Sequence, residues 1–115
     1  MSRVLLINDS KFESMVMKDM IDSMGCFVKV TDEDRAVYEV QSFKPDCVIV
    51  NYVMKKTFGD QLISVIKMQK PDVKCVLFSS NPIKMEDFRF KKIDAVFQTP
   101  VERGKLEGVL SKFAR

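Results

Sequence analysis

The chain has 115 residues, 46% of them hydrophobic and 30% charged, which suits one compact domain and excludes an intrinsically disordered protein. Nineteen basic and 16 acidic residues give a net charge of +3, and the basic residues are spread along the chain, so we expect no nucleic-acid partner. Apolar runs are short, so we expect no membrane span and no secretory signal, but a single cytoplasmic domain over residues 1–115.

The three cysteines, Cys26, Cys47 and Cys75, are far apart in the sequence, and each lies in an apolar stretch. The chain has no histidine, so a zinc site would need all three thiols and a carboxylate, and their spacing does not match a metal-binding motif. We therefore predict buried, reduced thiols that bind no metal.

Five short apolar runs predict β-strands. Apolar residues follow one another in these runs without alternation, which indicates strands covered on both faces, as in a parallel sheet between helices. The runs are residues 4–7, 26–30, 47–50, 75–78 and 95–97.

The first helix is predicted to begin after Ser10, because Ser10 and Glu13 have the spacing of a capping box, and to end at Gly25. Apolar residues at a spacing of four predict its buried face. These residues are Phe12, Val16, Met20 and Met24.

Three more segments, residues 33–43, 60–69 and 106–113, carry apolar side chains at helical spacing. Residues 84–92 are charged and predict a helix that is short or irregular. Strands and helices alternate along the whole chain, which predicts a doubly wound α/β domain with right-handed crossovers.

Polar residues follow the predicted strands at their carboxyl ends, where ligands bind in a sheet of this type. We expect them to form one pocket. They are Asn8, Asp9, Ser10, Asn51, Ser79, Ser80, Thr99 and Pro100.

These residues carry a resemblance to the receiver domain of response regulators. Residues 4–10 are similar to the receiver opening, a hydrophobic strand that ends in two acidic residues, and residues 48–54 with Gly59 to the strand and loop of the phospho-accepting aspartate. Residues 76–79 and 97–100 resemble the strands that end in a hydroxyl residue and in Lys-Pro. The resemblance implies two-component or phosphorelay signalling and a flavodoxin-like fold, with a five-stranded parallel sheet in the order 2-1-3-4-5 and helices on both faces.

The chain departs from the receiver pattern at the residues that perform its chemistry. The resemblance places Asn8 at the first acidic position, Asn51 at the acceptor position and Thr99 at the lysine position, while Asp9 and Ser79 retain the family's chemistry. A neutral amide is not a useful nucleophile, and Mg²⁺ relies on carboxylate ligands. We therefore expect an atypical receiver, or pseudo-receiver, with no phosphoryl transfer and no cofactor.

Several structural roles are also open for these pocket residues. A weak residual Mg²⁺ site would use Asp9 and Val53, but Asp9 also suits a helix entry. We expect Asn8 and Asn51 to hydrogen-bond each other or nearby loop amides, and Ser79 and Ser80 to satisfy backbone groups of their loop. The bond before Pro100 suits the cis form, as in the family's Lys-Pro.

We predict a signalling module, not an enzyme, that binds a protein partner or a second copy of itself without phosphorylation. Two alternatives remain open: a conventional phosphorelay receiver that uses Asp9, Asp46 or Asp60, and a small-molecule sensor in the pocket. A phosphotransfer enzyme with a cysteine in the first loop is disfavoured, because that loop has none. The predicted partner-binding surface comprises Phe88, Arg89, Phe90 and Lys91, with the alternative that Phe88 is part of the core.

Overall fold

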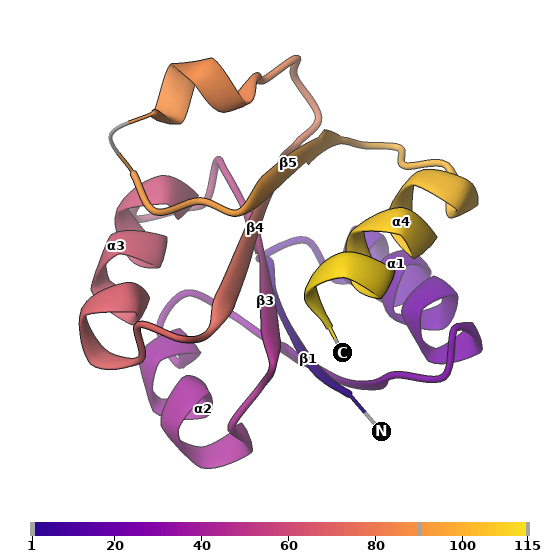
Figure 1. Cartoon of the computed structure of the whole chain (residues 1–115), viewed down its shortest axis with the longest axis horizontal. Coiled ribbons are helices and arrows are strands. Elements are labelled where there is room, and N and C mark those ends of the chain that lie inside the picture. Colours follow the sequence, from indigo (N-terminus) through magenta and orange to yellow (C-terminus); the bar gives the residue numbers. More distant parts are fainter. Residues whose placement is uncertain (1, 90, 115) are drawn as a thin grey trace.

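A computed structural model of the chain describes residues 2–89 and 91–114. Five strands form one parallel sheet in the order β2-β1-β3-β4-β5, as predicted (Figure 1). The strands are β1 (Arg3–Ile7), β2 (Phe27–Thr31), β3 (Cys47–Asn51), β4 (Lys74–Ser79) and β5 (Ala95–Gln98).

Helices cover both faces of the sheet. In Figure 1, α1 and α4 lie on one side of the strands, and α2 and α3 lie on the other. The helices are α1 (Lys11–Ser23), α2 (Ala36–Phe43), α3 (Gly59–Gln69) and α4 (Arg103–Phe113), with a single 3₁₀ turn, η1 (Met85–Phe88), between β4 and β5. The predicted doubly wound fold is therefore confirmed, and so is a short, irregular segment in place of a full helix before β5.

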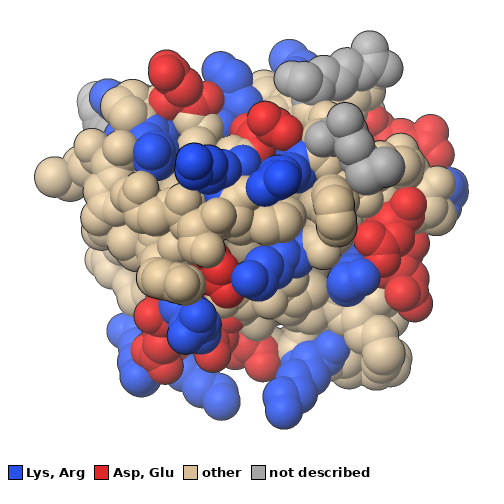
Figure 2. Space-filling view, turned by 90° about the horizontal axis from the view of Figure 1, so that it is seen from below, with Lys and Arg blue, Asp and Glu red and all other residues tan. Residues whose placement is uncertain are grey.

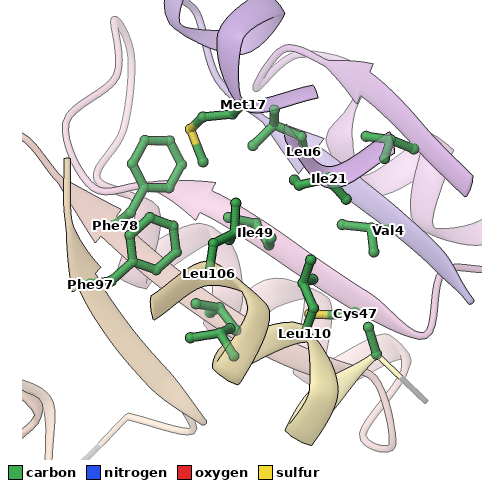
Figure 3. Close-up of a cluster of buried hydrophobic side chains, with 14 residues drawn as sticks. Val4, Leu6, Met17, Ile21, Cys47, Ile49, Phe78, Phe97, Leu106 and Leu110 are labelled. Atoms are coloured by element: carbon green, nitrogen blue, oxygen red, sulfur yellow. The ribbon is translucent and has the colours of Figure 1, made fainter. Parts of the chain in front are cut away.

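The central strands are buried on both faces because their apolar residues are consecutive. Alternate side chains of each strand enter two separate cores, one on each side of the sheet. Figure 3 shows the core on the α1 and α4 side, where the rings of Phe78 and Phe97 stack with centroids 5.5 Å apart. Met17 and Ile21 of α1 and Leu106 of α4 close this core.

The core on the α2 and α3 side includes a buried ion pair at its edge. The ammonium group of Lys67 lies 3.0 Å from a carboxylate oxygen of Asp94, which also accepts a hydrogen bond from the Cys75 amide at 2.8 Å. The Lys67 side chain is only 8% exposed. This pair joins α3 to the residue that precedes β5.

The predicted buried face of α1 is wrong in its first half. Phe12 is 74% exposed and Val16 is 44% exposed, whereas Ser14, Met17 and Ile21 are buried. A spacing of four exceeds the helical repeat of 3.6, so each step rotates the side chain by about 40° around the axis. Only the later part of the predicted row, Met20 and Met24, reaches the core.

The second helix begins at Ala36, three residues later than predicted. The preceding residues form a turn in which the Asp32 carboxylate accepts a hydrogen bond from the Arg35 amide at 3.0 Å. Glu33 extends from this turn toward the loop that follows β3.

No helix among the described residues is long and apolar enough to cross a membrane. The surface charge is mixed, as Figure 2 shows on the lower face, where lysine and arginine side chains lie among carboxylates.

Candidate functional site

Four strands of the sheet deliver polar residues to its carboxyl edge. Asn8 follows β1, Asn51 ends β3, Ser79 ends β4 and Thr99 follows β5. The strands β1, β3, β4 and β5 are successive neighbours in the sheet, so these residues gather at one end of it. The predicted pocket residues are therefore brought to a common edge.

Asn8 and Asn51 are joined by a direct hydrogen bond. The Asn51 Nδ2 donates to Asn8 Oδ1 at 2.9 Å, and the Ser10 amide donates to the same oxygen at 3.3 Å. The Asn8 Nδ2 in turn donates to Glu13 Oε1 at 2.9 Å. Asn8 is only 4% exposed, so its amide is both buried and bonded at each end.

Glu13 joins the pocket because only one half of the predicted capping box forms. The Ser10 hydroxyl accepts from the Glu13 amide at 3.3 Å, as a helix cap should. The Glu13 carboxylate binds the Asn8 side chain and not the Ser10 amide, which already donates to Asn8. The Glu13 carboxylate thus fixes the orientation of the Asn8 side-chain amide.

Two carboxylates bind the backbone of the loop after β3. Asp9 Oδ2 accepts from the Lys55 amide at 2.8 Å. The two oxygens of Glu33 accept from the Lys56 amide at 2.7 Å and from the Thr57 amide at 3.1 Å. Three successive backbone donors of this loop are therefore satisfied by the protein's own anions.

The same loop is packed against the sheet by aromatic rings. The Tyr52 ring lies 5.3 Å from the rings of both Phe58 and Phe88, measured between centroids. At the end of the loop, Gly59 lies directly against the Asn51 carbonyl, and an added Cβ would collide with that oxygen. A glycine is needed here because the chain passes so close to the end of β3.

Ser79 and Thr99 differ in how their hydroxyl groups are satisfied. The Ser79 hydroxyl accepts from the Asn81 amide at 3.1 Å, which confirms a role in the loop backbone. The Thr99 hydroxyl is buried and has no hydrogen-bond partner, and the bond from Thr99 to Pro100 is cis. Thr99 lines a groove of about 260 Å³ beside α1, together with Ser80 and Pro100.

The donor set at this edge does not fit Mg²⁺. The predicted ligand Asp9 already accepts from the Lys55 amide. The Asn8 Oδ1 accepts from Asn51, and the Asn8 Nδ2 donates to Glu13. No group of three or more Asp, Glu, Cys or His residues suited to a metal is present in residues 2–89 and 91–114. Val53 has an apolar side chain, so it offers only its backbone carbonyl as an oxygen ligand.

The predicted partner surface needs one correction. Phe88 is only 7% exposed, because its ring packs against Tyr52 in the core on the α2 and α3 side, so it cannot offer an aromatic surface to a partner. Arg89 and Lys91 are exposed, and Phe90 lies outside the described residues. The alternative that Phe88 belongs to the core is confirmed.

The cysteines also differ from the prediction in one respect. Cys47 and Cys75 are fully buried, and this burial raises the pKa of the Cys75 thiol to about 12 and that of Cys47 further. Cys26 is only partly buried, and its thiol pKa is raised by the same cause. Two of the three thiols are thus protected from reaction by the core.

Residues 4–99 match the family of the response regulator receiver domain. The chemotaxis protein CheY of Thermotoga maritima is 31% identical over 80 residues, which cover 68% of this chain and 67% of that protein. The chain therefore belongs to the response regulator receiver family, as its motifs predicted.

Solved receiver structures share the fold over almost the whole chain. Vibrio cholerae chemotaxis protein CheY4 superposes with a TM-score of 0.89 at 16% identity, covering 98% of both chains. A CheY-like receiver from Methylobacillus flagellatus gives a TM-score of 0.86 at 17% identity, covering 97% of this chain and 98% of its own. The receiver of a Pseudomonas aeruginosa sensor histidine kinase, which holds a magnesium ion in its active-site cleft, gives 0.84 at 18% identity and covers 98% and 97%.

Sequence reasoning missed two carboxylates at this site, Glu13 and Glu33. Glu13 carried a signal, because the first turn of the helix that follows β1 must lie near the end of β1. No sequence signal pointed to Glu33. It lies in the turn between β2 and α2 and accepts hydrogen bonds from residues 56–57, which belong to the loop between β3 and α3. Such long-range contacts depend on the packing of loops and not on local sequence.

Proposed function

We propose that this receiver acts as a protein-binding signalling module whose state does not depend on phosphorylation. The observation that carries the proposal is the hydrogen bond from Asn51 to Asn8 at the position where the family resemblance places the acceptor aspartate. The Asn51 nitrogen lone pair is delocalised and its oxygen is neutral, so neither atom attacks a phosphoryl group usefully.

The surrounding charges support the same conclusion. In an active receiver, the resemblance implies several carboxylates that hold Mg²⁺ and a lysine that pairs with the phosphoryl oxygens. Here the carboxylates of Asp9 and Glu13 already accept hydrogen bonds, and Thr99 carries no charge. A phosphoryl group brought to Asn51 would meet these anions without the lysine that the family pattern has at the position of Thr99.

A conventional phosphorelay role through another carboxylate has little geometric support. Asp46 accepts from the Arg3 amide at 2.9 Å, at the amino end of β1 and thus at the opposite edge of the sheet. Asp60 lies in the first turn of α3, and Asp9 is bound to the Lys55 amide. None of the three replaces the acceptor at the end of β3.

The test is incubation with acetyl phosphate and Mg²⁺ followed by intact-mass measurement. We expect no gain of about 80 Da, the mass of one phosphoryl group. The variant Asn8→Asp/Asn51→Asp/Thr99→Lys is the matched positive control and is expected to gain that mass. An alkali-labile adduct on the unmodified protein would overturn the proposal, and its absence together with uptake by the variant supports it.

A further inference from the structure

The first turns of α1 expose apolar side chains that the fold does not bury. Phe12 and Val16 are both exposed, although their helical spacing assigned them to the buried face of the helix. Together with the segment at residues 99–101, which follows β5, they line the groove of about 260 Å³ beside α1. Apolar side chains that gather around a hollow, and are not scattered singly over the surface, mark a binding site.

The size of the groove fits a small molecule. Its volume of about 260 Å³ equals that of about nine water molecules at ~30 Å³ each in the liquid. Drug-sized ligands occupy pockets of about 300–1,000 Å³, so this groove suits a smaller ligand, such as one aromatic ring with a short side chain. Met17 and Met20 also line the groove, and methionine side chains adapt their shape to what they contact.

The Thr99 hydroxyl is a second and independent indication of a ligand. Thr99 lines the groove and is only 5% exposed, yet its Oγ1 has no hydrogen-bond partner among the described residues. A buried hydroxyl without a partner costs free energy, and such groups are rare in folded proteins. A ligand that carries a hydrogen-bond donor at this end of the groove would satisfy the Thr99 hydroxyl.

The charge of the groove favours a cation. Glu13 is the one ionisable side chain among the described residues that line it. Its Oε1 accepts from Asn8 at 2.9 Å, whereas its Oε2 has no partner, and the carboxylate no ion pair, in the described part of the chain. Glu13 is half-buried, so solvent and salt screen its charge less than that of an open surface carboxylate. An ammonium group has three N–H donors and can therefore bind a carboxylate oxygen and a hydroxyl oxygen at the same time.

We propose that this groove binds a small organic amine with an apolar body. The apolar body lies against the exposed side chains of α1, and the ammonium group donates to Glu13 Oε2 and to Thr99 Oγ1. The same Glu13 carboxylate holds the Asn8 side chain through its other oxygen, so the ligand acts on the hydrogen bond between Asn8 and Asn51. The inference rests on the proposed function in one respect, because the amine supplies an input that phosphorylation does not give to this module.

The experiment is an NMR titration of ¹⁵N-labelled protein with phenethylamine, without a phospho-donor or Mg²⁺. We expect a dissociation constant of about 1 mM or lower, as suits a ligand of this size. Amide shift changes should gather on residues 12–17 and 99–101, and the side-chain amide signals of Asn8 and Asn51 should move with them. The neutral analogue 2-phenylethanol should bind about fivefold more weakly, and the anion 3-phenylpropanoate should not bind.

Two variants separate the polar contributions to binding. Glu13→Gln keeps an acceptor for Asn8 and removes the charge, so it should weaken phenethylamine about fivefold and leave 2-phenylethanol unchanged. Thr99→Val removes the hydroxyl at nearly the same shape, so it should weaken both compounds without lowering the stability of the fold. Asp19→Asn removes an exposed charge of α1 outside the groove and is the control for Glu13→Gln.

A matched pair of variants tests the apolar wall of the groove. Phe12→Ser should weaken phenethylamine and 2-phenylethanol fivefold or more, on the order of the loss of one buried apolar contact. Met15→Ser changes another exposed side chain of α1 that does not line the groove, so it should leave both affinities unchanged. Both side chains are exposed, and both variants are therefore expected to fold.

Three results would overturn the inference: no binding of phenethylamine at millimolar concentration, equal binding of 3-phenylpropanoate, or an unchanged affinity in Glu13→Gln or Thr99→Val. A dimer in sedimentation that Phe12→Ser dissociates and phenethylamine does not would also overturn it, because it assigns the groove to a second copy of the chain. These failures leave the proposed function standing, since its own test, the uptake of a phosphoryl group, is a separate measurement.

Discussion

The Asn51 side chain donates a hydrogen bond of 2.9 Å to the Asn8 side chain, and the Asn8 side chain donates one of 2.9 Å to the Glu13 carboxylate. Amide and carboxylate groups thus form one chain of hydrogen bonds between the ends of β3 and β1 and the first turn of α1. In this arrangement both polar side-chain atoms of Asn8 have partners, so the Asn8–Asn51 part of the pocket needs no ligand.

The first prediction concerns the charge of this pocket. In Asn8→Asp/Asn51→Asp/Thr99→Lys, new carboxylates crowd against Asp9 and Glu13, so the free energy of unfolding without metal should fall by about 2 kcal/mol. Mg²⁺ at ~10 mM should restore stability in the variant and leave the melting temperature of the unmodified protein unchanged. Urea and thermal unfolding with and without Mg²⁺ measure both effects. A shift of several degrees in the unmodified protein, abolished by Asp9→Ala, would contradict this expectation.

The second prediction concerns the loop after β3. Glu33→Gln weakens the acceptor of the Lys56 and Thr57 amides, and Asp9→Asn weakens the acceptor of the Lys55 amide. Each change should cost about 1 kcal/mol and should speed hydrogen exchange at the amides of residues 55–57. Asp19→Asn on the exposed side of α1 is the control. Unchanged exchange in the loop would mean that these carboxylates do not hold it.

The third prediction concerns the buried pair of Lys67 and Asp94. Asp94→Ala leaves the Lys67 charge buried and the Cys75 amide without its acceptor, so it should cost about 3 kcal/mol. Lys67→Met should cost about 1 kcal/mol or less, because Asp94 is 24% exposed and keeps the amide donor. Urea unfolding compares the two variants, and equal costs would refute this asymmetry.

The fourth prediction compares two glycines with opposite surroundings. Gly108→Ala should stabilise the fold by about 0.5–1 kcal/mol, because the new methyl group meets nothing and the helix gains a better helix former. Gly59→Ala should destabilise it by about 3 kcal/mol, because the methyl group collides with the Asn51 carbonyl. Thermal unfolding of both variants is the measurement. A destabilising Gly108→Ala would show that this glycine serves the fold.

The sequence allowed the fold and the pocket residues to be predicted for a simple reason. Consecutive apolar residues marked buried parallel strands, and in such a sheet the residues after each strand must meet at one edge, which brought Asn8 and Asn51 together. The contact of Glu33 with the loop at residues 56–57 could not be predicted, because it depends on how two loops pack. The burial of Phe88 likewise followed from a contact with Tyr52, which no local pattern indicates.

The last prediction concerns the buried thiols and alkaline pH. The core raises the pKa of Cys75 from its ordinary value of 9.0 to about 12 and raises that of Cys47 still more. Above pH 9 the unfolded chain loses thiol protons that the folded chain keeps. The free energy of unfolding should therefore fall by about 1.4 kcal/mol per pH unit for each thiol, and below pH 9 the thiols should have no effect.

Urea unfolding between pH 7 and pH 11 measures this slope against Cys47→Ala/Cys75→Ala, which retains every lysine and tyrosine and isolates the contribution of the two thiols. A thiol reagent at pH 8 should modify Cys26 first, since it is only partly buried, and the other two cysteines only after unfolding. Parallel pH profiles for the two proteins, or three equally reactive thiols in the folded state, would show that the core does not protect Cys47 and Cys75.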